Sequence, residues 1–245
     1  MTITLEVQSG VATVTIRRPE VMNALDVPAK ERLGQIWRAV AADDAVRVVV
    51  LTGEGERAFC AGSDIKEINR TGQMVTTEVL LDAIPGVGVR LDKPVIGALH
   101  GYCIGMGMTL ALHCDLRLAA RNTVIGYPEV RHGMISAMSA MRLGEVIPQA
   151  YAMELLLMAR NVDAAEAERF GLLNAVVDDV HATAAQWAER IASYPAIGVQ
   201  TTKRLATFNR RAAYAAARAE AIAAREAVEA KDDFRHGAAV HQARR

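Results

Sequence analysis

Residues 94–114, PVIGALHGYCIGMGMTLALHC, contain no aspartate, glutamate, lysine or arginine, and this run constrains the fold of the 245-residue chain more than any other. Its length would suffice for one membrane-spanning helix. However, it also holds four glycines, two histidines and an initial proline, which favour a buried strand, a glycine turn and a buried helix. We therefore expect the run to lie in a protein core, and we expect no membrane partner.

The formal net charge is zero, because 28 Lys and Arg residues balance 28 Asp and Glu residues. This balance gives no electrostatic argument for a nucleic-acid partner. The three cysteines, Cys60, Cys103 and Cys114, are odd in number and form no C-x-x-C pair, which argues against a disulfide framework. The sequence also shows no signal-peptide pattern and no metal-ligand spacing, so we expect a cytoplasmic protein without a metal.

Strand and helix patterns alternate along the first three quarters of the chain. Alternating apolar residues over 3–16 predict a β-hairpin, and helical spacing follows from Pro28 to about Ala42. Further strands are predicted at 46–52, 94–99, 115–119, 124–126 and 173–177. Mixed helix is predicted from the 60–64 loop to about Leu91. A turn at 101–107 is predicted to lead into a helix that ends near His113. Asp163 and Glu166 predict a capping box, and Gly171 suits the end of the helix that it opens.

From about residue 180 the chain becomes rich in Ala, Glu and Arg, which favours helices at 181–193, 196–209 and 211–230. These helices fit either a solvated amphipathic tail or a layer that contacts another subunit. Strands alternating with helices, followed by a helical C-terminal section, predict an α/β fold.

Two segments run from a buried strand through small residues into a helix: VVVLTG…FCAGSDI, and PVIGALHGYCIGMGMTL. Small residues let a ligand approach the main chain closely, and a helix N-terminus presents free N–H groups to it. Two such loops can each donate one N–H group to a single oxygen. We therefore predict an oxyanion hole, in which the loss of one donor costs roughly a hundredfold or more in rate.

Several segments of the chain form a recognisable series: the early RRPEVMNALD, then FCAGSDIKEI, KPVIGALHGYCIGMGMTLALHCDLRLA, the Pro128-Glu129 pair and AERFGLLNAVV. Their order is typical of the enoyl-CoA hydratase/isomerase (crotonase) family, which this chain resembles over about residues 11–177. The resemblance implies a crotonase-like ββα spiral core over 1–190 and a C-terminal helical oligomerisation region over 191–245. It also implies an acyl-CoA substrate, a homotrimer or hexamer, and no cofactor beyond the coenzyme A of the substrate.

The same resemblance implies four catalytic positions. Ser63 and Met106 match the two oxyanion donors, and any residue except proline retains the N–H group that is needed. Glu129 matches the second of the two glutamates that family hydratases use. The first glutamate would lie three residues after Met106, where this chain has Thr109. A hydroxyl can hold water but cannot act as an ionisable base near neutral pH.

One carboxylate suits a proton shuttle between two carbons of a substrate, so we favour a Δ3-Δ2 enoyl-CoA isomerase-like reaction with Glu129 as acid and base. The alternatives are a hydratase whose water is held by Thr109, and a non-catalytic acyl-CoA-binding protein. Ala137 stands where some relatives carry a second acid, which argues against the dienoyl-CoA isomerase and dehalogenase patterns. A dinucleotide-dependent oxidoreductase is also disfavoured, because Leu110 stands where G-x-G-x-x-G has its third glycine.

Other residues are predicted to contact the substrate. They are Ala61, Gly62, Asp64, Ile65, Lys66, Tyr102, Gly105, Gly107 and Met134. Lys66 could bind the CoA phosphates or be an ordinary exposed lysine, and Asp64 is also expected to cap the helix that starts at Ile65. His132 lies close to Glu129 in sequence and could be a second proton carrier, but it is expected to be structural or exposed. His100 and His113 are expected to bind main-chain groups, and Met134, Met138 and Met141 to fill the core or line an apolar pocket.

Overall fold

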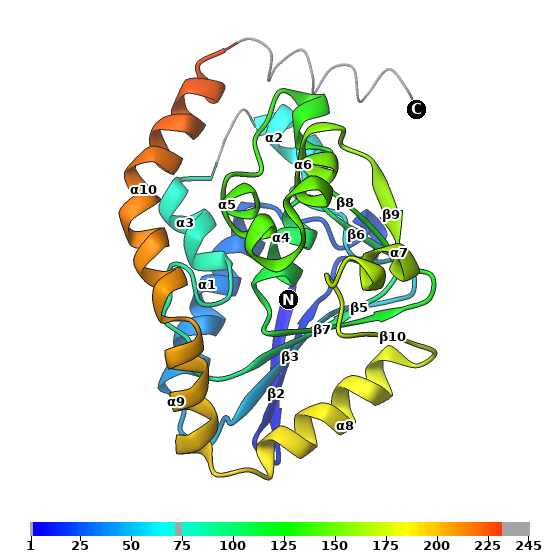
Figure 1. Ribbon diagram of the computed structural model, residues 1–245, viewed down its shortest axis with the longest axis vertical. Coiled ribbons are helices and arrows are strands. Elements are labelled where there is room, and N and C mark those ends of the chain that lie inside the picture. The colour runs from blue at the N-terminus through cyan, green and yellow to red at the C-terminus, as the bar shows by residue number, and fades with distance from the viewer. Residues whose placement is uncertain (1, 72–74, 232–245) are drawn as a thin grey trace.

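The computed structural model describes residues 2–71 and 75–231, which form a layered α/β fold (Figure 1). The central sheet has the strand order β1-β2-β3-β5-β7-β10. Its strands are β1 (Ile3–Gln8), β2 (Val11–Ile16), β3 (Val48–Gly53), β5 (Val95–Leu99), β7 (Leu116–Ala120) and β10 (Ala175–Val177). The predicted hairpin of β1 and β2 is confirmed as antiparallel, and the other neighbours pair in parallel.

A second, smaller sheet has the order β4-β6-β8-β9. Its strands are β4 (Ala58–Cys60), β6 (Tyr102–Ile104), β8 (Val124–Gly126) and β9 (Asn161–Asp163). The prediction that 101–107 is only a turn is therefore wrong, because β6 pairs in parallel with both β4 and β8. Since β4 and β6 are parallel neighbours, the loops that follow them leave the sheet at the same edge.

The helices occur mostly where helical spacing predicts them. They are α1 (Val27–Ala42), α2 (Ile65–Thr71), α3 (Thr77–Ala83), α4 (Met106–His113), α5 (Ala137–Val146), α6 (Gln149–Leu157), α7 (Ala164–Arg169), α8 (Val180–Ala192), α9 (Ala196–Ala206) and α10 (Phe208–Glu229), with the 3₁₀ turns η1 (Pro19–Val21) and η2 (Glu129–His132). The prediction of mixed helix to Leu91 is wrong, because α3 ends at Ala83 before Pro85 and Gly86.

Both faces of the central sheet are covered, which explains its runs of β-branched residues. Val48, Val50 and Ile96 pack on one face against α8. Figure 1 shows α8, in yellow, lying along the sheet. The alternate residues Val49 and Leu51 face the main core on the other side. This alternation with a period of two places each side chain of β3 against one of the two layers.

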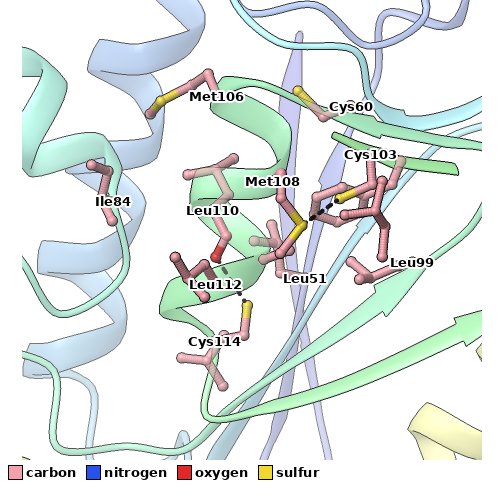
Figure 2. Close-up of a cluster of buried hydrophobic side chains, with 14 of the residues drawn as sticks. Leu51, Cys60, Ile84, Leu99, Cys103, Met106, Met108, Leu110, Leu112 and Cys114 are labelled. Carbon is pink, nitrogen blue, oxygen red and sulfur yellow. Dashed lines mark hydrogen bonds between the residues drawn. The ribbon is translucent and has the colours of Figure 1, made fainter. Parts of the chain in front are cut away.

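The charge-free run 94–114 forms β5, β6 and α4, and every residue of α4 is buried. Figure 2 shows the side chains of Met106, Leu110 and Leu112 along α4, with Cys103 in contact with Met108 beside it. The expected roles of two histidines are confirmed: His100 Nε2 donates to Gly53 O at 3.0 Å, and His113 Nδ1 donates to Thr109 O at 2.8 Å. Within the described residues, no helix is long and apolar enough to cross a membrane.

The capping box predicted for α7 is only half formed. Asp163 accepts a hydrogen bond from Glu166 N at 2.8 Å, as a helix cap does. The Glu166 carboxylate instead accepts two hydrogen bonds from Arg160, at 2.8 and 3.0 Å. An arginine with matching geometry has therefore replaced the reciprocal bond.

The described part of the C-terminal section consists of α8, α9 and α10, and α10 runs along one side of the molecule next to α3 (Figure 1). Arg225 of α10 donates hydrogen bonds to Val75 O and to the Thr77 hydroxyl at the start of α3. The part of the predicted oligomerisation region from 232 to 245 lies outside the described residues. The boundary near residue 190 stays a prediction.

Candidate active site

A cavity of about 730 Å³ lies where the two predicted loops meet. One wall comes from the segment after β4, a second from the segment after β6, and a third from η2 and the residues that follow it. Residues of η1, α1, α3 and α10 also line it. A cavity of this size, with apolar walls and a few polar groups, is typical of a small-molecule site.

Ser63 lies in the first wall with its backbone held on both sides. Leu25 N donates to Gly62 O at 2.8 Å, and Asp64 N donates to Leu25 O at 2.9 Å. These two bonds use the residues on either side of Ser63. The N–H group of Ser63 itself makes no backbone hydrogen bond within the described part of the chain. Asp64 accepts from Glu67 N and so caps α2, which confirms that expectation.

Met106 begins α4, directly after β6 and Gly105. The first N–H groups of a helix have no partner inside it, and Met106 N donates to no backbone acceptor among the described residues. A β-carbon on Gly62 would lie 3.7 Å from Met106 N, so the two loops touch. Gly62 and Gly105 have φ angles of 108° and 56°, a region that other residues rarely adopt.

Gly107 has a different task from its neighbours. It does not line the cavity, and a β-carbon there would lie 2.0 Å from Cys60 O. The absence of a side chain lets the start of α4 approach the end of β4. The structure thus places Gly107 behind the loops, where it packs them together, and not at the substrate-contacting surface that we predicted for it.

Glu129 opens η2, and one of its carboxylate oxygens faces the second loop. A β-carbon on Gly105 would lie 3.2 Å from Glu129 Oε1, which places the carboxylate beside the residue that precedes Met106. The other oxygen, Oε2, is buried and has no hydrogen-bond partner among the described residues. Burial raises the pKa of Glu129, while hydrogen bonds from its own N–H group and from Ser136 act in the opposite direction.

Thr109 lies one helical turn after Gly105 and lines the same cavity. Its Oγ1 donates to Gly105 O at 3.2 Å and lies 2.8 Å from the hydroxyl of Ser139 on α5. If Ser139 donates to Thr109, one lone pair of Oγ1 can still accept a hydrogen bond from a ligand or a water molecule in the cavity. The hydroxyl that replaces the expected glutamate is thus fixed by two polar partners.

The remaining predicted contact residues cluster around these groups. The cavity lining includes Ala61, Gly62, Asp64, Ile65, Lys66, Tyr102, Gly105 and Met134. Met138 and His132 also line it, whereas Met141 lines a neighbouring cavity of about 270 Å³ between α3, α5 and α10. Met134 and Met138 therefore form part of an apolar wall.

Three lining or supporting residues were missed at the sequence level. Ser139 supports Thr109, Arg225 reaches the cavity from α10, and Lys30 lines it from α1. Lys30 carries a readable signal, because it precedes Leu33 by three residues and Trp37 by seven, on the apolar stripe of its helix. A lysine on such a stripe calls for an explanation.

The three cysteines are free and buried. In the described part of the chain, no cluster of three or more His, Cys, Asp or Glu side chains is arranged to bind a metal ion. The polar groups that face the cavity include the Glu129 carboxylate, the Thr109 hydroxyl and the cations Lys30 and Arg225. Together with the two backbone N–H groups of the loops, a carboxylate suits acyl chemistry through an oxyanion.

Residues 6–245 match the sequence pattern of the Enoyl-CoA hydratase/isomerase family, and the chain belongs to that family. An (E)-benzylidenesuccinyl-CoA hydratase of Thauera aromatica is 39% identical over 214 residues, which cover 86% of this chain and 84% of that protein. A short-chain-enoyl-CoA hydratase of Clostridium acetobutylicum is 35% identical over 210 residues, or 82% of this chain and 79% of that one.

Solved structures agree with this assignment. The crystal structure of a carnitinyl-CoA hydratase from Mycobacterium avium has a TM-score of 0.87, covers 100% of this chain and 96% of that one, and is 30% identical. The predicted crotonase-like fold is therefore confirmed. With these relatives, the chain is an enzyme of the lyase or isomerase type.

Proposed function

We propose that this enzyme adds water to the double bond of a 2-enoyl-CoA thioester, and catalyses the reverse dehydration, with Glu129 as its only carboxylate acid and base. The observation that carries the proposal is the buried Glu129 carboxylate beside the second oxyanion loop, with the Thr109 hydroxyl in the same cavity. The hydratase names of the Thauera and Clostridium relatives favour hydration over the isomerase reaction that the missing glutamate first suggested.

In the proposed mechanism, the thioester oxygen accepts hydrogen bonds from Ser63 N–H and Met106 N–H. A water molecule donates one hydrogen bond to Thr109 Oγ1 and one to the Glu129 carboxylate. As the water oxygen bonds to C3, Glu129 takes a water proton and the π electrons move to the thioester oxygen. The enolate then re-forms the carbonyl, and Glu129 returns a proton to C2.

Two features support a single carboxylate in both roles. Other acidic side chains of the described lining are Glu20, which is exposed, and Asp64, which binds Arg18 at 3.2 Å and caps α2. Glu129 is thus the acidic lining residue whose oxygen is buried without a partner. A carboxyl group with a raised pKa is also a better proton donor to carbon near neutral pH.

A Δ3-Δ2 enoyl-CoA isomerase reaction is the second candidate, and the same single carboxylate favours it. There Glu129 would remove a proton from C2 of a 3-enoyl thioester, and the dienolate would be held by the same N–H groups. Glu129 would then protonate C4. This route does not require the hydroxyl of Thr109.

Turnover assays separate the two reactions. We expect loss of the conjugated thioester absorbance on incubation with crotonyl-CoA, and with (E)-benzylidenesuccinyl-CoA if the substrate resembles that of the Thauera relative. Turnover of a 3-enoyl-CoA with no hydration of any 2-enoyl-CoA would favour the isomerase. Binding of these thioesters with no turnover and no α-proton exchange would identify a non-catalytic acyl-CoA-binding protein.

We further propose that residues 191–245 hold the subunits of a trimer or hexamer in the cytoplasm. Large apolar side chains are exposed on and beside α9, which supports a covered surface. They are Tyr194, Ile197, Leu205 and Phe208. Light scattering of the purified chain tests the assembly, and a monomer at micromolar concentration would contradict it.

A further inference from the structure

We propose that Lys30 binds a free carboxylate on the acyl group, so that the preferred substrate is the CoA monothioester of a dicarboxylic acid. This inference rests on the proposed function for its substrate frame. Lys30 lies in the first turn of α1, lines the cavity and is only 2% exposed. Its ammonium group has no hydrogen bond or ion pair with a described residue.

The position of Lys30 is close to the predicted oxyanion hole. Leu25, whose N–H and carbonyl groups bind the backbone on both sides of Ser63, directly precedes the Asp26 cap of α1. Lys30 is one helical turn beyond that cap. Lys30 and Ser63 line the same cavity, so one ligand bound there can contact both.

The neighbouring acids attract this cation, but neither forms an ion pair with it among the described residues. Asp26 accepts a hydrogen bond from Ala29 N at 2.8 Å and forms an ion pair with Arg18 at 3.1 Å. The charge of Glu67 raises the pKa of Lys30, but the described residues show no ion pair between the two side chains, and Glu67 is not part of the cavity lining. Cys60 is neutral, because burial raises the pKa of its thiol to about 12.

Burial lowers the pKa of Lys30 to about 8, so the ammonium form still predominates near pH 7. An unpaired buried charge is costly, and the N-terminal end of a helix disfavours a cation further. A bound anion would remove both penalties. Lys30 is therefore better explained by a ligand than by the stability of the free protein.

Arg225 strengthens the positive field in this part of the cavity. Its guanidinium group is held by Val75 O and Thr77, lines the same cavity and acts on Lys30 as a like charge. The surrounding lining is apolar, with Val75, Leu80 and Ile84. Two cations in an apolar chamber favour a carboxylate carried on a hydrocarbon chain.

A phosphate of CoA is the other anion to consider. The diphosphate of a bound CoA is strongly hydrated and suits an exposed rim, where Lys66, Tyr102 and Arg131 of the lining are exposed. Lys30 is buried instead. The depth of the ammonium group therefore favours the acyl carboxylate over a CoA phosphate.

The test compares unreactive saturated thioesters of equal chain length, so that it does not depend on turnover. Dissociation constants for glutaryl-CoA and pentanoyl-CoA, and for adipyl-CoA and hexanoyl-CoA, are measured by calorimetry on the full chain. We expect the carboxylate to tighten binding of at least one pair by about tenfold to a hundredfold. Lys30→Met and Lys30→Gln should abolish that preference while leaving the affinity for free CoA unchanged.

Lys66→Met serves as the matched control, since it should weaken or spare both members of each pair equally. Thermal unfolding confirms that each variant is folded, and two Lys30 variants guard against the failure of one. The absence of any carboxylate preference in the native enzyme would overturn the proposal. A loss of free-CoA affinity in both Lys30 variants would assign Lys30 to a phosphate and would also overturn it. Failure to hydrate crotonyl-CoA, with the binding preference intact, would count against the proposed reaction alone.

Discussion

The two halves of the candidate active site, the oxyanion loops and the side chains opposite them, depend on the amino-acid sequence in different ways. The oxyanion loops contribute backbone N–H groups of Ser63 and Met106, so side chains there can vary as long as the loops keep their path. The opposite half consists of side chains, and there Thr109, in contact with the hydroxyl of Ser139, stands where a second carboxylate would act. Backbone groups thus define the class of reaction, while side chains choose the reaction within it.

The largest effect is expected on the side-chain half. Glu129→Gln keeps the shape of the residue but removes its ability to take and return a proton. We expect turnover to fall by about a thousandfold, within the usual range for a lost general acid or base. Steady-state kinetics measure this loss, and calorimetric binding of a saturated acyl-CoA shows whether the site is intact. Turnover within tenfold of the native rate would mean that another group moves the proton.

The backbone half is tested at Met106, the first residue of α4. Proline is well tolerated at the first position of a helix but has no N–H group. We expect Met106→Pro to reduce turnover by about a hundredfold or more. Met106→Ala removes the same side chain and keeps the N–H group, so its rate should stay far closer to the native one. Equal losses in both variants would show that Met106 contributes packing and not a donor.

Thr109 lies between the two halves, because its side chain binds Gly105 O of the second loop. We expect Thr109→Val, which replaces the hydroxyl by a methyl group, to slow hydration by about tenfold to a hundredfold. Thr109→Ser retains the hydroxyl and should recover most of the rate. Hydration of crotonyl-CoA measures both variants. A native rate in Thr109→Val would remove the water-holding role.

The smallest effect concerns stability. Burial raises the pKa of Glu129 above its ordinary value of 4.5, so the unfolded chain loses this proton first as pH rises. Below 4.5 both states are protonated and Glu129 has no net effect. Above it, ionisation increasingly favours the unfolded state, and this loss of stability reaches its full and lasting size once the folded pKa is passed. Glu129→Gln should therefore melt a few degrees higher than the native protein at neutral pH, with no difference at pH 4. Scanning calorimetry at both pH values checks this.

Much of the fold could be predicted because its signals are local. The alternation of β1 and β2, the helical spacing of α1 and the caps at Asp64 and Asp163 each depend on neighbours in sequence. The strand β6 was taken for a turn because it is short and glycine-flanked, and only its pairing with β4 and β8 makes it a strand. Such pairing is not written in any local pattern.

The candidate site divides in the same way. Glu129, Thr109 and the two loops could be placed because each lies in a recognisable motif. Ser139 and Arg225 could not, because their contacts join α5 to α4 and α10 to α3 across long stretches of sequence. Lys30 could be predicted in part. The sequence shows its position on the apolar stripe of α1, but only the structure shows that it lines a cavity. Gly107 shows the reverse error, since this glycine inside a motif packs α4 against the end of β4 and is not among the residues that line the cavity.

The central claim is that one carboxylate moves the proton while the backbone holds the enolate. Solvent deuterium exchange at the α-carbon of butyryl-CoA tests it most directly, because this exchange needs the enolate and a base but no added water molecule on C3. NMR or mass spectrometry follows the label in the native enzyme, Glu129→Gln and Thr109→Val. The account predicts exchange in the native enzyme, near-native exchange in Thr109→Val and none above background in Glu129→Gln. Undiminished exchange in Glu129→Gln would contradict it.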